Sequence, residues 1–335
     1  MVGFNRIING AMVIDQRNAG VSVTPTDGAY TLDRWQAGLI QTSKFSVQQN
    51  AGAISGPTGF ANYLGATSLT TYAVLAGDNF GIRQQVEGFN FSDFGFGTAA
   101  ASSVTLSFWV RSNLTGTFGG SLRNSASNRS YPFTYAIAAA NTWEQKTVTI
   151  AGDTSGTWIG ATSGIGVSLN FSLGAGATFS GTAGAWAGAN YTSATSATSV
   201  VAGTGNTFYI TGVQLEKGTV ATSFDASPYG TELALCQRYC VVIAQNSFFG
   251  TATVRTTTSI YAVAPVPVPL RAAPTLTGAT VIYVGDLNGT ATLSLSMSGN
   301  VLQGSGSIAS GVGTAGQCGA FASGPTNSVT LSSEL

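Results

Sequence analysis

The chain has 335 residues, a length that suggests two domains of ordinary size. Only 8% of the residues are charged and 44% are hydrophobic, while Lys plus Arg and Asp plus Glu number 13 each, so the net charge is zero. A balanced charge without any run of Lys or Arg argues against nucleic acid as a partner. So few charged residues are not enough to cover the surface of a monomer. We therefore expect part of the surface to be buried between subunits of a homo-oligomer.

Alternation with a period of two residues dominates the chain and predicts half-buried antiparallel strands. Residues 104–111 place Val104, Leu106, Phe108 and Val110 on one face. The same pattern returns at 165–172, where Gly166, Ser168, Asn170 and Ser172 lie opposite the apolar residues, and again at 293–297. Clusters of Gly, Ser, Thr and Asn separate these runs, which is typical of a sandwich. The sequence therefore predicts an all-β fold.

The stretch 173–206 is rich in Gly, Ala, Ser and Thr, with Trp186 and Tyr191 embedded in it. Such a composition suits a flexible linker. Because strands are expected on both sides, we interpret the stretch as a long loop of the sandwich instead.

A single segment has helical spacing. Thr231 is suited to cap a helix that opens with Glu232, and apolar residues then recur at intervals of three or four: Leu233, Cys236, Cys240 and Ile243. We expect a connecting helix over 226–245, between a β sandwich over 1–225 and a smaller β domain over 246–335.

Several segments resemble phage tail-fibre and related virion proteins that carry a jelly roll of the carbohydrate-binding-module type followed by a tip module. The segments are Asn5–Arg17, Tyr30–Trp35, Thr207–Gly218, Ala221–Asp225, Glu232–Tyr239, Val268–Pro274 and Ser333–Leu335. Each motif is weak alone, but their order covers nearly the whole chain. The resemblance implies an antiparallel jelly roll over 1–225 and a tip domain over 246–335.

The resemblance also implies a function: a tail fibre or receptor-binding protein, commonly trimeric, that contacts other virion proteins and a glycan of the host cell surface. A head fibre or capsid decoration protein is the alternative, and a glycan depolymerase is a remote one. No signal peptide is expected, because residues 1–9 carry no basic segment followed by an apolar one. No membrane span is expected either, because no uninterrupted apolar run approaches the necessary length. Lysis of the host, rather than secretion, would release such a virion protein.

Catalytic and metal-binding residues are not expected. The chain has no His, so the usual general base for a Ser or Cys nucleophile is missing. A glycosidase needs two neighbouring carboxylates, but acidic residues such as Asp153 and Asp286 have simpler interpretations as turn residues. Cys236 and Cys240 have one distant companion, Cys318, which is too few ligands for zinc. We expect no catalytic residue, no metal and no cofactor.

The residues themselves do not point to a metal, but the resemblance implies a position for one. Jelly rolls of this type often hold a structural calcium, whose oxygen-rich positions fall near Asn9 and Thr211 here. This chain has Thr211 and Gly212 where an acidic pair is often found.

Glycan binding is the sharpest functional hypothesis, because sugar rings stack on exposed aromatic side chains. The candidates are Trp158, Trp186 and Tyr191, all in Gly-rich surroundings. The simpler interpretation is that each plugs an end of the sandwich or a subunit contact. By the resemblance, the host is expected to meet the loops of the tip domain, including 286–289 and 311–319.

Overall fold

The structure is a computed structural model that describes residues 4–244, 247–256, 258–277, 280–283, 292–298, 301–307, 315–316, 318–323 and 328–335. Strands dominate it, as expected from the alternating sequence. The chain forms two compact units: residues 1–232 with Leu335, and residues 233–334. Of the expected host-facing loops, 286–289 lies outside the described residues, as does 311–314 with residue 317.

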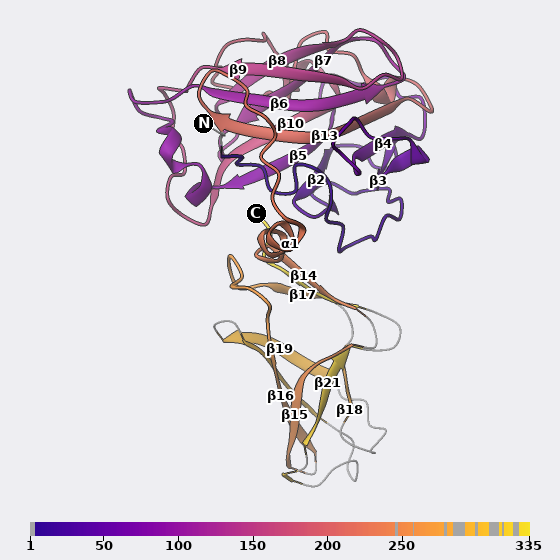
Figure 1. Cartoon of the computed structure of the whole chain (residues 1–335), viewed down its shortest axis with the longest axis vertical. Coiled ribbons are helices and arrows are strands. Elements are labelled where there is room, and N and C mark those ends of the chain that lie inside the picture. Colours follow the sequence, from indigo (N-terminus) through magenta and orange to yellow (C-terminus); the bar gives the residue numbers. More distant parts are fainter. Residues whose placement is uncertain are drawn as a thin grey trace. The chain divides into compact units, whose positions relative to one another are not determined.

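Unit 1 (residues 1–232 with Leu335) is an antiparallel jelly-roll sandwich, so the predicted fold class is confirmed (Figure 1). Its first sheet has the order β1 (Tyr30–Leu32), β2 (Trp35–Leu39), β5 (Asn79–Glu87), β10 (Ile165–Ala175), β7 (Gly116–Arg123) and β8 (Ser130–Ile137). Its second sheet has the order β3 (Phe45–Gln49), β4 (Leu64–Ser68), β13 (Thr207–Lys217), β6 (Val104–Ser112) and β9 (Glu144–Ile150).

The core of unit 1 lies between these two sheets. Strand alternation sends Val167, Leu169 and Phe171 of β10 inward, where all three are fully buried. Phe108 of the second sheet meets Phe171 of the first edge to face, with ring centroids 5.0 Å apart. Aromatic pairs of this geometry stabilise a core beyond the area that they bury. The alternation that predicted the strands therefore also defines the core.

The last strand, β13, fastens the segment that follows it. The buried Glu216 carboxylate accepts hydrogen bonds from the Gln214 amide at 2.9 Å, from the Thr222 backbone at 2.9 Å and from the Thr222 hydroxyl at 2.8 Å. Gln214 in turn accepts from the Asp225 backbone at 2.7 Å. The two motifs 207–218 and 221–225, singled out in the sequence, thus form one hydrogen-bonded closure.

The helix is shorter than the expected range 226–245. Helix α1 spans Tyr229–Gln237, and Cys240–Ile243 form strand β14. The run from Val241 to Ile243 is β-branched, which favours a strand even though Cys240 and Ile243 continue the helical spacing. Within the described ranges, no helix is long and apolar enough to span a membrane.

Unit 2 (residues 233–334) is also built of antiparallel strands. A small sheet has the order β14, β22 (Val329–Ser332) and β17 (Thr275–Thr277). A larger sheet has the order β18 (Thr280–Tyr283), β21 (Cys318–Ser323), β15 (Phe248–Thr256), β16 (Ser259–Pro265), β20 (Val301–Ser307) and β19 (Thr292–Ser298). Alternate residues of its central strands are buried, including Val254, Ile260 and Leu302.

Candidate functional site

The outer face of the first sheet of unit 1 carries polar side chains. Since Val167, Leu169 and Phe171 point into the core, the alternate residues of β10 point outward. Strand register then places four polar residues next to one another across β2, β5, β10 and β7. This polar row consists of Gln36, Arg83, Asn170 and Ser121.

Hydrogen bonds fix the side chains of the polar row. Arg83 donates from Nε to the side-chain oxygen Oε1 of Gln36, and the Asn170 amide donates to the Ser121 hydroxyl at 3.3 Å. Arg123 lies two residues beyond Ser121 on the same face of β7. It donates from Nη2 to Asn170 Oδ1 at 3.4 Å and from Nη1 to Asn190 Oδ1. Asn170 is therefore flanked by two guanidinium groups. A site held in this way is organised before any ligand arrives.

Arginine side chains carry a positive charge at neutral pH. Burial lowers the pKa of Arg123 to about 10, and the neighbouring charge of Arg83 acts in the same direction. Arg123 is only 7% exposed, whereas Arg83 is half-buried. In the described part of the chain, neither of them forms an ion pair with a carboxylate.

A small hollow lies beside the polar row, with room for about one water-sized group. It is lined by Gly38, Asn79, Phe80, Gly81, Arg83, Asn170, Phe171, Ser172 and Thr192. None of these residues is acidic. Within the described residues, the only hydrogen bond from the Arg83 side chain is the one from Nε, so its two Nη groups are free to donate to a ligand.

Residues 176–199, here called the covering segment, lie over part of this sheet. Two short parallel strands, β11 (Ser180–Gly181) and β12 (Ser193–Ala194), hold the covering segment together. It crosses β7 so closely that a Cβ at Gly119 would lie 2.4 Å from Ser193 Oγ. Thr192 donates to Asn79 Oδ1 at 2.6 Å and forms one wall of the hollow. The interpretation of this stretch as a loop of the sandwich is consistent with these contacts.

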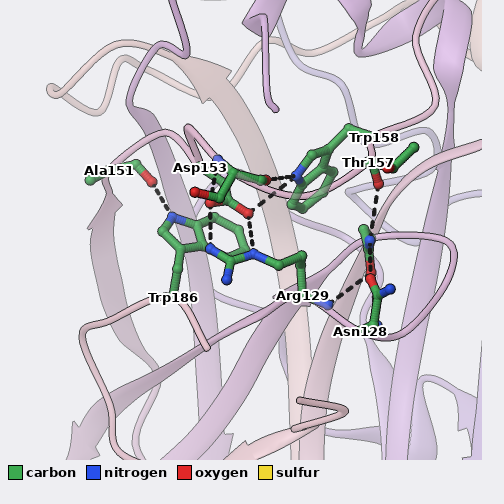
Figure 2. A network of polar contacts seen from close by, with 9 residues as sticks. Asn128, Arg129, Ala151, Asp153, Thr157, Trp158 and Trp186 are labelled. Atoms are coloured by element: carbon green, nitrogen blue, oxygen red, sulfur yellow. Dashed lines mark hydrogen bonds and ion pairs between the residues drawn. The ribbon is translucent and has the colours of Figure 1, made fainter. Parts of the chain in front are cut away.

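Two of the three predicted glycan-binding residues lie together, in a different place. Figure 2 shows Asp153 between Arg129 and the indole of Trp158. Arg129 donates to both carboxylate oxygens, at 2.8 Å and 2.6 Å, and this bond raises the pKa of the guanidinium. Trp158 donates to Asp153 at 3.2 Å, and Trp186 donates to the Ala151 carbonyl at 2.7 Å.

The two indole rings pack edge to face, with centroids 5.4 Å apart. Phe96, which is buried, meets both of them, at 4.9 Å from Trp158 and 5.7 Å from Trp186. Both tryptophans are half-buried against the core. This packing agrees with the simpler interpretation, in which they close an end of the sandwich. Their role in glycan binding stays a prediction.

Tyr191 is not part of this aromatic group. Its ring lies against Gly181, where an added Cβ would approach the ring to 2.3 Å. In the covering segment it stands between Asn190, which binds Arg123, and Thr192, which lines the hollow. Tyr191 therefore neighbours the polar row, and its glycan role also stays a prediction.

Sequence reasoning missed the polar row itself. The alternation at 165–172 had placed Ser168, Asn170 and Ser172 on the polar side of β10. Arg83 and Gln36 lie far away in the sequence, however, and only strand register shows that they are neighbours of Asn170.

The positions that the resemblance assigns to calcium do not fit that ion. Asn9 Oδ1 accepts the Ile14 backbone N–H at 3.0 Å, and its amide donates to the carbonyls of Ile14 and Asp33. The Thr211 hydroxyl donates to the Asn62 carbonyl at 2.7 Å. Calcium requires six to eight oxygen ligands, usually with carboxylates. Over the described ranges, no group of three or more His, Cys, Asp or Glu is arranged to hold a metal.

No family model matches the chain, and no curated protein matches it either. Several solved structures are distantly similar to the chain. The enzymatically active domain of bacteriophage CBA120 tailspike protein 4 is 13% identical, with a TM-score of 0.33 over 64% of this chain and 21% of that one. The carbohydrate-binding module TmCBM61, solved with β-1,4-galactotriose, is 11% identical, with a TM-score of 0.32 over 64% of this chain and 99% of that one. The family 11 carbohydrate-binding module of a Clostridium thermocellum cellulase is 12% identical, with a TM-score of 0.29 over 60% and 96%. The chain thus spans about a fifth of the tailspike domain.

Proposed function

We propose that this chain is a glycan-binding adhesion protein of a phage particle, acting in a tail fibre and without catalysis. One observation carries the glycan-binding part of the proposal. On the outer face of a jelly-roll sheet, the half-buried Arg83 of the polar row lines a small hollow together with the buried Asn170.

The chemistry of this face suits sugars. Sugar hydroxyls both donate and accept hydrogen bonds, and protein sites read them with a few convergent polar groups. The half-buried Arg83 offers Nη donors, and the buried polar side chains of Asn170, Thr192 and Ser172 line the same hollow. The hydrogen bonds within the row hold these groups in place, which lowers the entropy cost of binding.

The absence of acidic residues from the lining of the hollow supports a binding role over hydrolysis. Glycosidases use two carboxyl groups on either side of the bond that is cleaved. The residues that line the hollow are apolar, amide, hydroxyl or guanidinium side chains, with several glycines. The chain also contains no His to act as a general base.

The virion role rests on the order of the sequence motifs and on the low charge. A fibre protein of this kind would be a homo-oligomer, most simply a trimer. Repeated weak sites on one particle then bind a glycan surface through avidity, even when each single site binds only in the millimolar range.

A glycan array probed with the purified full-length chain tests the binding role. We expect a defined set of glycans to bind, and Asn170→Ala to weaken the binding because the amide stands at the centre of the row. The matched control is Gln145→Ala, an exposed amide on β9 of the other sheet. Failure of the oligomer to bind any glycan would refute the proposal. Antibody labelling of the encoding phage in electron micrographs tests the tail location, and labelling of the head would refute it.

A further inference from the structure

Arg83 lines the hollow and Arg123 contacts Asn170 beside it, and both differ from the arginines that form ion pairs. Arg129 is bound by Asp153 with N–O distances down to 2.6 Å, and Arg6 lies 2.9 Å from Asp93. Arg83 and Arg123 have only amide oxygens as hydrogen-bond partners among the described residues. Charge is scarce in this chain, with 13 basic residues in all, so two unpaired guanidinium groups on one sheet face are conspicuous.

Holding these two cations together costs free energy. A buried charge is expensive unless it is paired, and like charges repel more strongly where the effective dielectric constant is low. Arg123 is 7% exposed and Arg83 lies on the strand at the other side of β10. A structural role alone would be served as well by two uncharged side chains. An anion bound between them would remove the repulsion.

We propose that the hollow receives the carboxylate of an acidic sugar, with Arg83 as its main partner, which rests on the glycan-binding role proposed above. The planar fork of a guanidinium matches the two oxygens of a carboxylate. The Nη groups of Arg83 are free for this contact. The hollow has room for about one water-sized group. It therefore takes only the carboxylate, while the sugar ring and the rest of the glycan lie outside.

Each neighbour of the carboxylate has a distinct part. Asn170 and Thr192 form the polar walls around the carboxylate, and Arg123 supplies a second positive charge through its position next to Asn170. A neutral sugar should therefore bind more weakly than an acidic one, because it leaves the two guanidinium groups without an anionic partner.

Titration calorimetry with the full-length chain tests this inference. The probes are trisaccharide fragments of polygalacturonate, alginate and hyaluronan, each as the free acid and as the methyl ester, which keeps the ring and removes the charge. We expect at least one free acid to bind at least about tenfold more tightly than its ester. Affinity should fall as salt is added, because salt screens the attraction between charges.

Variants separate the inference from the proposed function. Arg83→Gln should weaken binding of the acid by about tenfold or more and weaken binding of the ester much less, so that the preference for the acid is lost. Arg255→Gln, at an exposed arginine of unit 2, should change neither affinity. Thermal unfolding of each variant verifies that it folds. Equal affinities for acid and ester, with Arg83→Gln behaving as the wild type, would overturn the acidic-sugar inference and leave glycan binding intact. If neither these probes nor any neutral glycan binds, both proposals fail.

Discussion

Replacing Arg129 by Met should show how strongly the Asp153 cluster holds the end of the sandwich. Arg129→Met removes the cation and keeps the apolar stem of the side chain. The Asp153 side chain is only 2% exposed and loses two short hydrogen bonds, while it keeps those from Trp158 and from the Ser155 backbone. Removing one partner of a buried ion pair costs about 3–5 kcal/mol. The two remaining bonds place the expected loss near the lower end, about 3 kcal/mol.

The matched control is Lys146→Met. Lys146 lies 2.6 Å from Glu144, and both side chains are partly exposed, at 19% and 17%. The Arg129 side chain has the same exposure, 19%, so the two pairs differ mainly in the burial of the carboxylate. Exposed pairs contribute about 1 kcal/mol or less. We therefore expect Lys146→Met to be nearly neutral.

Thermal unfolding measured by calorimetry distinguishes the two variants. For a domain of about 150–250 residues, each kcal/mol shifts Tm by about 2–4 °C. Arg129→Met should lower the Tm of unit 1 by about 6–12 °C, and Lys146→Met by no more than about 4 °C. Equal shifts in the two variants would refute the reasoning that burial of Asp153 makes its ion pair a main support of this region.

Four further predictions concern the fold and assembly. Glu216→Ala should lower the free energy of unfolding of unit 1 by about 1–3 kcal/mol in denaturant titrations, because the buried Gln214 and the half-buried Thr222 lose their acceptor. Gly119→Val should lower Tm, since its Cβ would displace the covering segment at Ser193; an unchanged Tm would show that this segment is loosely attached. A fragment of residues 1–232 should unfold cooperatively by itself, and a molten product would contradict that. The full-length chain should sediment as a trimer at micromolar concentration, and a stable monomer would exclude the proposed oligomer.

The sandwich was predictable because alternation is a local property of the chain. Residues 104–111 and 165–172 show which side chains face the core, and the structure buries Phe108 and Phe171 as expected. The helix was predicted too long because Cys240 and Ile243 satisfy helical spacing by coincidence, while pairing with β22 decides in favour of a strand. Local spacing does not reveal such a long-range pairing.

The candidate site was harder to predict for the same reason. Trp158 and Trp186 were singled out as bulky aromatics in Gly-rich surroundings, and the structure does bring them together. The polar row depends on three strand pairings, and the residues of the longest one, Arg83 and Asn170, are 87 positions apart in the sequence. When the register of the strands is unknown, the sequence does not distinguish Arg83 from any other arginine on a strand.

The covering segment links the aromatic cluster to the polar row, and this affects how substitutions at Trp186 are interpreted. Trp186 is followed by Ala187, which pairs with Ser130 at the start of β8. Three residues later Asn190 binds Arg123, and Thr192 forms a wall of the hollow. A substitution of Trp186 can therefore affect the hollow through the backbone of the covering segment, without any contact between the indole and a sugar.

Arg129→Met disturbs the same cluster and leaves the aromatic rings in place. If it weakens glycan binding as much as a Trp186 substitution does, the tryptophan acts by positioning the covering segment. If only the Trp186 substitution weakens binding, the ring itself contacts the sugar.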